Sequence, residues 1–374
     1  MNKTIKIILI VVLIVGIVLI SLVKKPLIEP VTNLSFEKIN IIGETAGSGV
    51  FDPSIEYNED GTIGWLAYSP VKNWPEDVNT AIARTTDNGK TWEKIIEVNP
   101  SIPGTVVDNG VIINGMWRHE VSTLLHDPDD PGKEWKLYWH RYFAKPPYLS
   151  EEKDRMLQYG WIAYKYASDP SGPWSEEVPL FGAGQFPSEP YSAEIDLNTF
   201  HDDLNYVVAY SEPGSLYNDG TIYLALQTFK LESSKLKTSV ILISSNDHGN
   251  TWKYIGVIID DNDAADFDSL FFDAPSLAEE NGRVFLLVSR VNEKTILRYG
   301  TYVFEFEDIT TAKLKRDDKH ELIAYKYLPP ILDGGQEGQG DYDQHNIYGG
   351  IIISEANAKN SPPLAIYNTK EKII

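Results

Sequence analysis

The chain has 374 residues, of which 42% are hydrophobic and 11% aromatic, so it can bury a large core. Its formal net charge of −21 at pH 7 excludes nucleic-acid partners, because no basic stripe is present to neutralise phosphates. We interpret this charge as a solvated acidic surface rather than a cation-binding one. The absence of cysteine excludes disulfides and thiolate metal sites.

The N-terminal segment predicts a membrane helix. Residues 7–23 form an apolar run broken only by Gly16 and Ser21, and lysines flank the run on both sides. This length lies at the short end for a spanning helix and at the long end for a signal-peptide core, and no small-residue cleavage site follows. We therefore expect residues 1–25 to be an uncleaved signal anchor, with a cleaved signal peptide as the alternative.

The segment that follows predicts a link and then the start of the folded domain. Residues 26–35, with Pro26 and Pro30, predict a short stalk. Residues 36–42 alternate enough to form a strand before the first full repeat. We expect this strand to complete the last blade of a ring, because closure by both chain ends removes an exposed sheet edge. The folded domain is then residues 36–374.

From residue 45 onward the chain reads as repeated strands. Short runs rich in aromatic and β-branched residues alternate with Gly, Pro, Asn and Asp turns, and no further helix is expected. A similar unit returns about every 70 residues, and a period of this size built only from strands indicates radial repetition of four-stranded sheets. The predicted fold is all-β, a five-bladed β-propeller. The marker residues of the five units are Asp52, Glu120, Asp196, Asp273 and His345.

Two turns share the Asp-box pattern Ser/Thr-x-Asp-x-Gly-x-Thr-Trp, at residues 85–92 and 245–252. In this pattern the aspartate accepts hydrogen bonds from the turn, glycine supplies a positive φ and tryptophan packs against the blade. We therefore expect Asp87 and Asp247 to be structural residues on outer hairpins. The pattern is typical of propellers with sialidase-like hairpins and says little about chemistry.

The innermost strands of a propeller all start at one mouth, so their acidic residues are expected to meet there. Carboxylates that converge shift one another's pKa values, so that one stays protonated while another stays ionised. Cleavage of a glycosidic bond needs this combination of an acid with a base or nucleophile. The alternative is that these side chains only cap strands or line a hydrated tunnel. The candidate catalytic residues are Asp52, Glu120, Glu194, Asp196 and Asp273.

These motifs resemble the five-bladed glycoside hydrolases of the arabinanase, β-xylosidase and α-L-arabinofuranosidase type. The resemblance covers most of residues 45–368 and depends on the order of five short motifs, at residues 51–54, 117–121, 195–200, 272–275 and 345–346. It implies that Asp52 is the general base and that Asp196 tunes the acid. Asp273 stands where the family has a glutamate as the general acid. Because aspartate is one methylene shorter, Glu194 or Glu120 is the alternative acid.

The same resemblance implies a set of binding residues. His345 is similar to the axial histidine of the fifth blade, which helps to hold a central calcium ion or a water cluster. No cofactor is required, and such a calcium ion would be structural. The expected substrate-binding residues are Trp117, Arg118, His119, Tyr191, Arg290 and His345.

We therefore expect an extracytoplasmic glycoside hydrolase, inverting, that acts on an oligo- or polysaccharide. It would be a single-pass protein of the cell membrane, or secreted if the N-terminal segment is cleaved. One alternative is a sialidase-like exo-glycosidase, but that enzyme needs three arginines around the substrate carboxylate. Arg118 and Arg290 can face the mouth, whereas Arg84 is expected on a mid-blade strand, and an acidic mouth repels sialic acid. A non-catalytic propeller that binds glycans or a protein is the other alternative.

Overall fold

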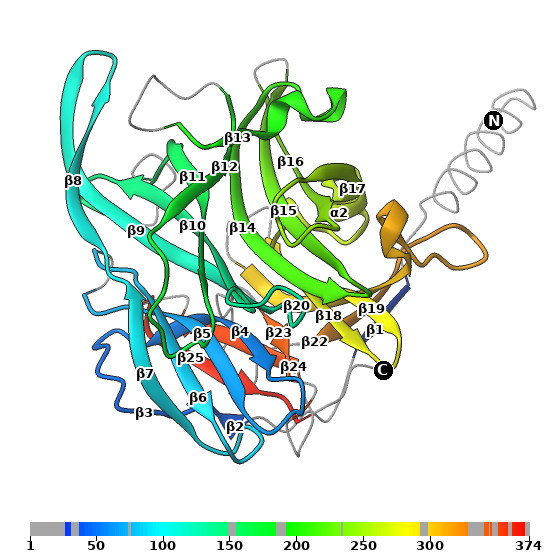
Figure 1. Ribbon diagram of the computed structural model, residues 1–374. Helices are drawn as coiled ribbons and strands as arrows, with labels where there is room; N and C mark the ends of the chain where they lie inside the picture. The colour runs from blue at the N-terminus through cyan, green and yellow to red at the C-terminus, as the bar shows by residue number, and fades with distance from the viewer. Residues whose placement is uncertain are drawn as a thin grey trace, which may run out of the picture.

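Five β-sheets stand around one axis in the computed structural model, which is an all-β, propeller-like arrangement (Figure 1). No helix in the described part of the chain is long and apolar enough to cross a membrane. The predicted anchor, residues 1–25, lies outside the described residues. These are 27–30, 37–73, 76–148, 155–184, 192–232, 235–291, 298–327, 340–343, 345, 351–357 and 361–370.

The first two sheets each have their innermost strand near the axis. The first sheet has the order β3 (Ile41–Ile42), β7 (Trp92–Asn99), β6 (Thr80–Thr85), β5 (Gly64–Pro70) and innermost β4 (Val50–Tyr57). The second has the order β13 (Ile195–Asp196), β12 (Val178–Gly182), β11 (Arg155–Ala167), β10 (Trp135–Ala144), β9 (Val111–His126) and β8 (Ile102–Asp108). The C-terminal part of β9 is the inner strand of the second sheet. Its N-terminal part forms a hairpin with β8 that projects from the ring (Figure 1).

The third and fourth sheets continue the ring. The third has the order β14 (Val207–Asn218), β15 (Thr221–Glu232), β16 (Lys235–Ser245) and β17 (Lys253–Asp260), with β14 innermost. The fourth has the order β18 (Phe271–Glu280), β19 (Arg283–Val291), β20 (Arg298–Asp308), β22 (Ile323–Tyr327) and β1 (Leu27–Pro30), and β21 (Lys313–Leu314) also pairs with β20. Part of the segment predicted as a stalk is therefore the strand β1, which pairs in parallel with β22.

The fifth sheet combines the C-terminal strands with one strand from the N-terminal part of the chain. Its order is β23 (Asp341–Tyr342), β24 (Ile351–Asn357), β25 (Ser361–Asn368) and β2 (Glu37–Lys38). The pairing of β2 with β25 confirms that the N-terminal strand completes the last sheet. The C-terminal end of the predicted strand does not join the last sheet, because β3 pairs with the first sheet instead.

Helical structure among the described residues is short. It consists of α2 (Asp261–Asp266) and the 3-10 turns η1 (Leu197–Thr199), η2 (Asp202–Leu204) and η3 (Ile309–Thr311). The helix α2 was not expected from the sequence. It forms because the Asp260 side chain accepts from the N–H groups of Asn262 and Asp263, and the Asp263 side chain accepts from the Asp260 N–H in return.

The core lies between the sheets. Radial sheets are covered on both faces, so their strands are nearly continuous buried runs; β5 is buried along its whole length. Each neighbouring pair of sheets shares one apolar cluster, from the first and second sheets round to the fourth and fifth. Ile366 of the fifth sheet packs into the cluster of the first, so these contacts also close the ring.

The two Asp-box turns form the hydrogen bonds that their residues predict. Asp87 accepts from the Thr91 N–H at 2.9 Å, and Asp247 accepts from the Thr251 N–H at 2.8 Å. The adjacent glycines have φ values of 77° and 89°. The turns join β6 to β7 and β16 to β17, on the outer hairpins of their sheets, which supports the structural role expected for both aspartates.

The closure of the ring predicts a specific difference between two isoleucines. Ile39 is buried, and its N–H donates to the Ile366 carbonyl at 2.9 Å, whereas Ile42 is 62% exposed. We predict that Ile39→Ala lowers the free energy of unfolding by about 2–4 kcal/mol. The matched Ile42→Ala should change it by less than about 0.5 kcal/mol. Chemical denaturation of both variants checks this, and equal effects would contradict the closure described here.

Candidate active site

Each of the four long inner strands contains a β-bulge, and one residue of each bulge has a positive φ. The φ values are 50° at Asp52 in β4, 51° at Val121 in β9, 50° at Glu212 in β14 and 48° at Ala274 in β18. The pairing register shifts at each of these points. Such conformations are uncommon outside glycine, and both they and bulges gather at functional sites.

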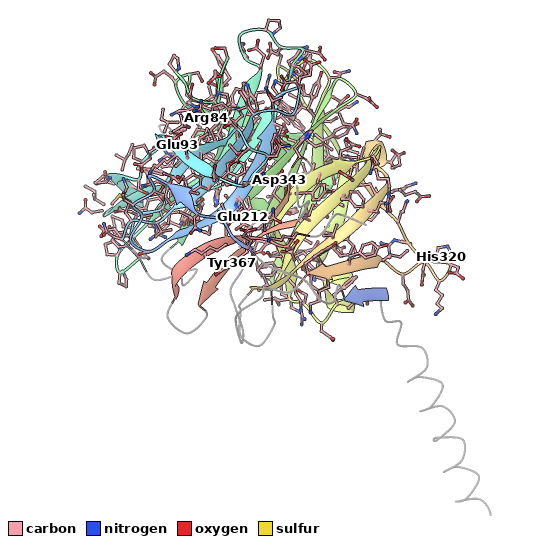
Figure 2. The ribbon with its side chains drawn as sticks, turned by 90° about the horizontal axis from the view of Figure 1, so that it is seen from below. Arg84, Glu93, Glu212, His320, Asp343 and Tyr367 are labelled. Carbon is pink, nitrogen blue, oxygen red and sulfur yellow. The ribbon has the colours of Figure 1, made fainter. Side chains whose placement is uncertain are left out.

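A buried carboxylate accompanies every one of these bulges. Asp52 and Glu212 are themselves the residues with positive φ, whereas Glu120 and Asp273 stand one residue before it. All four side chains are at most 7% exposed. Acidic residues are rarely buried to this extent without a functional or structural reason. Because the four strands are equivalent in the ring, their bulges bring the four carboxylates to one end of the axis. Figure 2 shows Glu212 near the centre of the ring.

Side-chain hydrogen bonds join each inner strand to the next, close to the bulges. We call these five bonds the inner circuit. The first three are Leu124 N–H to Ser54 Oγ at 3.0 Å, Thr123 Oγ1 to Ser215 Oγ at 2.8 Å, and Ala274 N–H to Glu212 Oε2 at 2.7 Å. The last two are Ser276 Oγ–H to Asp341 Oδ1 at 2.9 Å and Ile55 N–H to Asp341 Oδ2 at 2.7 Å. The fifth sheet is thereby tied to both of its neighbours, and the circuit closes.

A cavity of about 220 Å³ lies on the axis beyond the inner circuit. It is lined by Glu56, His126, Tyr217 and Glu279, which follow the bulges of the four long inner strands, and by Asp341 of β23. Burial raises the pKa of Asp341 to about 7. Burial, and then the charge of Asp341, raise the pKa of Glu56 well above its usual range. Asp341 and Glu56 are therefore protonated more readily than surface carboxyl groups.

The prediction that Asp196 and Glu194 open a third inner strand is wrong. β13 pairs with β12 at the outer edge of the second sheet. Asp196 caps η1 there, accepting from the Asn198 N–H at 3.0 Å and the Gly184 N–H at 2.8 Å. Glu194 pairs with the same edge, since its N–H donates to the Pro179 carbonyl at 2.7 Å.

The carboxylate of the third inner strand is Glu212, which the sequence analysis missed. A signal for it existed. Residues 211–214 read Ser-Glu-Pro-Gly, an acid followed by proline, as in the Phe-Asp-Pro-Ser of residues 51–54. In both sheets the proline comes directly after the residue with positive φ, and Pro275 follows Ala274 in the same way in the fourth sheet.

The prediction that His345 faces the same mouth as Asp52 is also wrong. Its ring packs against Tyr57 with a centroid distance of 4.6 Å, and Tyr57 ends β4 whereas Asp52 is near its start. The His345 carbonyl accepts from Asn88 Nδ2 at 3.2 Å. Burial lowers the pKa of this imidazole. Among the described residues, no group with metal-ligand spacing includes His345.

The predicted binding residues of the second sheet divide into core and rim. Trp117 packs against Phe143 and Trp161 in the core between the first and second sheets. His119 is also internal: its Nδ1 accepts from Trp139 Nε1 at 2.9 Å, which leaves the proton of a neutral ring on Nε2. Burial, and then the charges of nearby Arg141 and Lys165, lower the pKa of His119 well below its usual value.

Two arginines lie beside the carboxylates. The Arg118 Nε–H donates to the Glu76 carbonyl at 3.1 Å, and the guanidinium lies 5.7 Å from the ring of Tyr148, so this side chain runs toward the loops before β6 and after β10. Arg290 pairs with Phe272, the neighbour of Asp273, and donates to the Asp268 carbonyl at 2.6 Å. Tyr191, the remaining predicted binding residue, lies outside the described residues.

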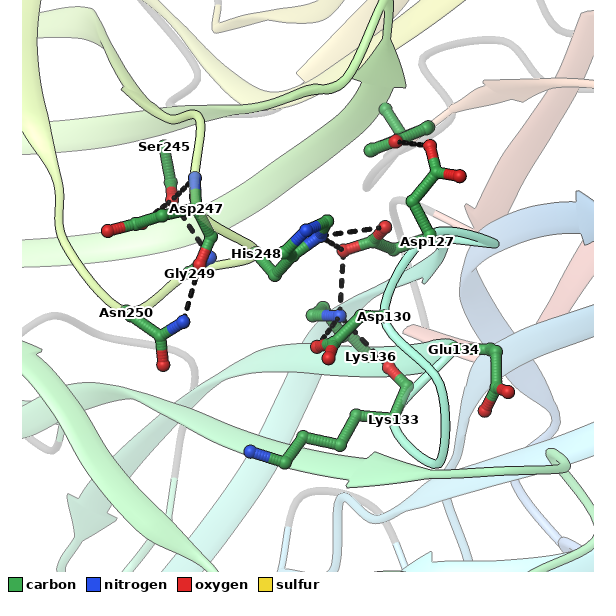
Figure 3. Close-up of polar contacts among 12 residues, drawn as sticks. Asp127, Asp130, Lys133, Glu134, Lys136, Ser245, Asp247, His248, Gly249 and Asn250 are labelled. Carbon is green, nitrogen blue, oxygen red and sulfur yellow. Dashed lines mark hydrogen bonds and ion pairs between the residues drawn. The ribbon is translucent and has the colours of Figure 1, made fainter.

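One cluster among the described residues has metal-ligand spacing, and it is away from the bulges. Asp127, Asp130 and His248 form it, where the loop after β9 meets the Asp-box turn of the third sheet (Figure 3). Lys136 Nζ lies 2.8 Å from both carboxylates and also donates to the Lys133 carbonyl at 2.9 Å. Lys136 and Asp127 are fully buried. The Lys136 ammonium therefore occupies the position that a metal ion would take. The cluster is an ion-pair network that joins two sheets.

Comparison with known proteins identifies the fold. No protein-family model and no curated protein sequence matches the chain. A thermostable family-43 glycoside hydrolase shares the fold with 12% identity and a TM-score of 0.52 over 88% of this chain and 91% of that chain. The catalytic domain of the Coprinopsis cinerea GH62 alpha-L-arabinofuranosidase does so with 10% identity and a TM-score of 0.50 over 92% and 96%.

A third structure of this fold is the Bombyx mori GH32 beta-fructofuranosidase, with 13% identity and a TM-score of 0.50 over 86% of this chain. The chain spans 59% of that protein's length. At these identities the likeness is one of fold. It confirms the resemblance to propeller glycoside hydrolases at that level.

The ion-pair network predicts a large effect of removing its ammonium. Lys136→Met should leave two carboxylates facing each other without a cation, lowering the free energy of unfolding by about 3–5 kcal/mol. Lys133→Met is the matched control, because that ammonium lies outside the network, 4.9 Å from the Tyr166 ring. Urea denaturation measures both variants. Equal stabilities of Lys136→Met and the unchanged protein would show that the network contributes nothing.

Proposed function

We propose that this protein is a glycoside hydrolase whose active site lies where the inner strands of a five-bladed propeller begin. The observation that carries the proposal is the set of four buried carboxylates at equivalent bulges, Asp52, Glu120, Glu212 and Asp273. Hydrolysis of a glycosidic bond needs one carboxyl group as the acid and a second as base or nucleophile. A shared fold with glycoside hydrolases supports the proposal.

Within this site we assign Asp52 as the base and Glu212 as the acid. Their strands, β4 and β14, are separated by β9, so a sugar ring bound at the level of the bulges would lie between them. Inverting enzymes hold their two carboxyl groups about 6.5–9.5 Å apart, to leave room for a water molecule. Residues on inner strands that are not neighbours suit this wider separation. Glu120, on β9, stands between the two strands and Asp273, on β18, follows Glu212, so their charges would help to hold a proton on the acid.

The substrate that we propose is an oligo- or polysaccharide. The partly exposed ring of Tyr148, held beside the buried Arg118, offers an aromatic surface for a sugar on the same side as Glu120. Two solved structures that share the fold are named furanosidases, so furanosides are the first substrates to test. Polymers of this kind lie outside cells, which supports an extracytoplasmic protein held by the apolar run at residues 7–23.

The sialidase alternative receives less support. Arg84, which would complete a set of three arginines, lies on β6 with a 40% exposed side chain, 3.9 Å from Glu93. In Figure 2 both residues are at the periphery of the ring, far from Glu212. A carboxylate substrate would also meet four buried acids at the bulges and be repelled.

The proposal predicts that Asp52→Asn abolishes turnover without unfolding the protein. The amide cannot accept a proton from water, so kcat should fall by at least about 100-fold. Asp203→Asn, on an exposed turn of the third sheet, should leave kcat unchanged. The assay uses aryl arabinofuranosides, fructofuranosides, xylosides, galactosides and sialosides, with NMR of the first anomer released.

Release of the inverted anomer by the unchanged protein supports the assignment of a base. Turnover of a sialoside would favour the sialidase instead. Glycan binding without any turnover would mean that the propeller is a receptor and not an enzyme.

A further inference from the structure

We propose that Asp341 is a positioning residue that holds the bulges of the first and fourth sheets in register, and so sets the placement of Asp52 and Asp273. The carboxylate comes from the fifth sheet and contacts both neighbouring sheets at once. Its catalytic consequence rests on the proposed glycosidase function, whereas its structural consequence does not.

Asp341 accepts one hydrogen bond from each of the two neighbouring sheets, and we call this pair of bonds the clasp. Oδ2 accepts from the Ile55 N–H at 2.7 Å and Oδ1 accepts from the Ser276 hydroxyl at 2.9 Å, in a side chain that is 5% exposed. Ile55 and Ser276 each stand three residues after a carboxylate of the bulges, Asp52 and Asp273. A shift of Asp341 would therefore be transmitted along three residues of backbone to each of the two carboxylates.

The bulged strands need such a support. At a bulge the ladder is interrupted, and β4 and β18 both lose regular pairing there, between residues 51 and 54 and between 273 and 276. Ile55 belongs to the innermost strand of its sheet, so its N–H on the axis side has no further strand to pair with. A buried N–H without an acceptor is costly, and Asp341 supplies that acceptor from another sheet.

The surroundings of Asp341 make its ionisation sensitive to pH near neutrality. Burial, and to a lesser extent the neighbouring Asp343, raise the pKa of Asp341 to about 7, against the opposing effect of its hydrogen bonds to Ile55, Tyr342 and Ser276. The other titratable side chains that line the same cavity are Glu56, Tyr57 and Glu59 of the β4 segment, His126 of β9, Tyr217 of β14, Glu279 of β18 and Tyr342 of β23.

Two opposite pH trends follow for the clasp. Above pH 7 the carboxylate accepts both bonds, whereas the protonated group accepts from Ile55 but must donate to the Ser276 hydroxyl, as an asparagine would, so turnover should fall by no more than about threefold as the pH drops through 7. Stability moves the other way. The folded-state pKa exceeds the ordinary value of 3.8, so the folded protein binds a proton that the unfolded chain lacks between about pH 4 and pH 7. This group therefore makes the fold less stable as the pH rises over that interval.

Two variants separate the clasp from its charge. Asp341→Asn keeps the shape: its carbonyl oxygen can accept from Ile55, and its amide can donate to the Ser276 hydroxyl. Asp341→Ala removes both bonds. We expect Asp341→Ala to lower kcat by about tenfold or more with little change in KM, because misplacement of reacting groups acts on the chemical step. Asp341→Asn should retain kcat within about threefold, but without the acid limb near pH 7.

Amide hydrogen exchange provides a readout that does not depend on any substrate. Protection of the Ile55 N–H should fall at least about tenfold in Asp341→Ala and persist in Asp341→Asn. The Tm of the unchanged protein should fall relative to that of Asp341→Asn as the pH rises from 4 to 7. Exposed Asp203→Asn is the control for both measurements.

The outcomes distinguish this proposal from the glycosidase proposal. Loss of Ile55 protection in Asp341→Ala, in a protein that cleaves no glycoside, would support the clasp and reject the enzyme. Full turnover with an unchanged pH profile in Asp341→Ala would reject the clasp while leaving the enzyme intact. If Asp341→Ala does not fold, loss of the step near pH 7 from the pH profile of Asp341→Asn supports the clasp, and a step there like that of the unchanged protein overturns it.

Discussion

An inner strand of a propeller has one edge that faces the axis, where no further strand can pair with it. In this protein the inner circuit uses that edge: five side-chain hydrogen bonds tie each inner strand to the next and finally return to the first. The apolar clusters between the sheets contribute the bulk of the burial. The circuit adds direction, because hydrogen bonds require defined geometry where apolar contacts do not. The inner circuit fixes the position of each inner strand along the axis. It therefore also fixes the level at which the bulges lie.

The bulges above the circuit combine strain with buried charge. A positive φ in a residue other than glycine costs about 1–3 kcal/mol and persists only where the surroundings enforce it. Glu212 carries such a φ and also belongs to the circuit, since its carboxylate accepts from the Ala274 N–H. Asp52 carries one three residues before Ile55, which the circuit holds from the fifth sheet. The contacts that fix the inner strands therefore also stabilise the strained backbone that places acidic residues on the axis.

Much of this arrangement could be predicted from the sequence, because strand periodicity and turn residues are local signals. They predicted the all-β fold, the N-terminal strand of the last sheet and the place of Asp52. The expectation that Asp196 opens the third inner strand depends on a regular repeat, whereas β12 and β13 extend the second sheet and delay β14. Glu212 stayed hidden for that reason. His345 was misplaced because strand register, which decides the level a side chain reaches on the axis, depends on partners far away in the chain.

The comparison of Glu212→Gln with Asp196→Asn tests the central claim most directly. Both substitutions replace a carboxyl group by an amide of almost the same shape, but Glu212 lies at a bulge on the axis whereas Asp196 caps a turn at an outer sheet edge. The measurement is kcat/KM for one cleaved glycoside, with circular dichroism to confirm folding. The account predicts a loss of at least about 100-fold for Glu212→Gln and no more than about threefold for Asp196→Asn. Equal losses, or a larger loss for Asp196→Asn, would contradict the assignment of the inner-strand carboxylates as the catalytic groups.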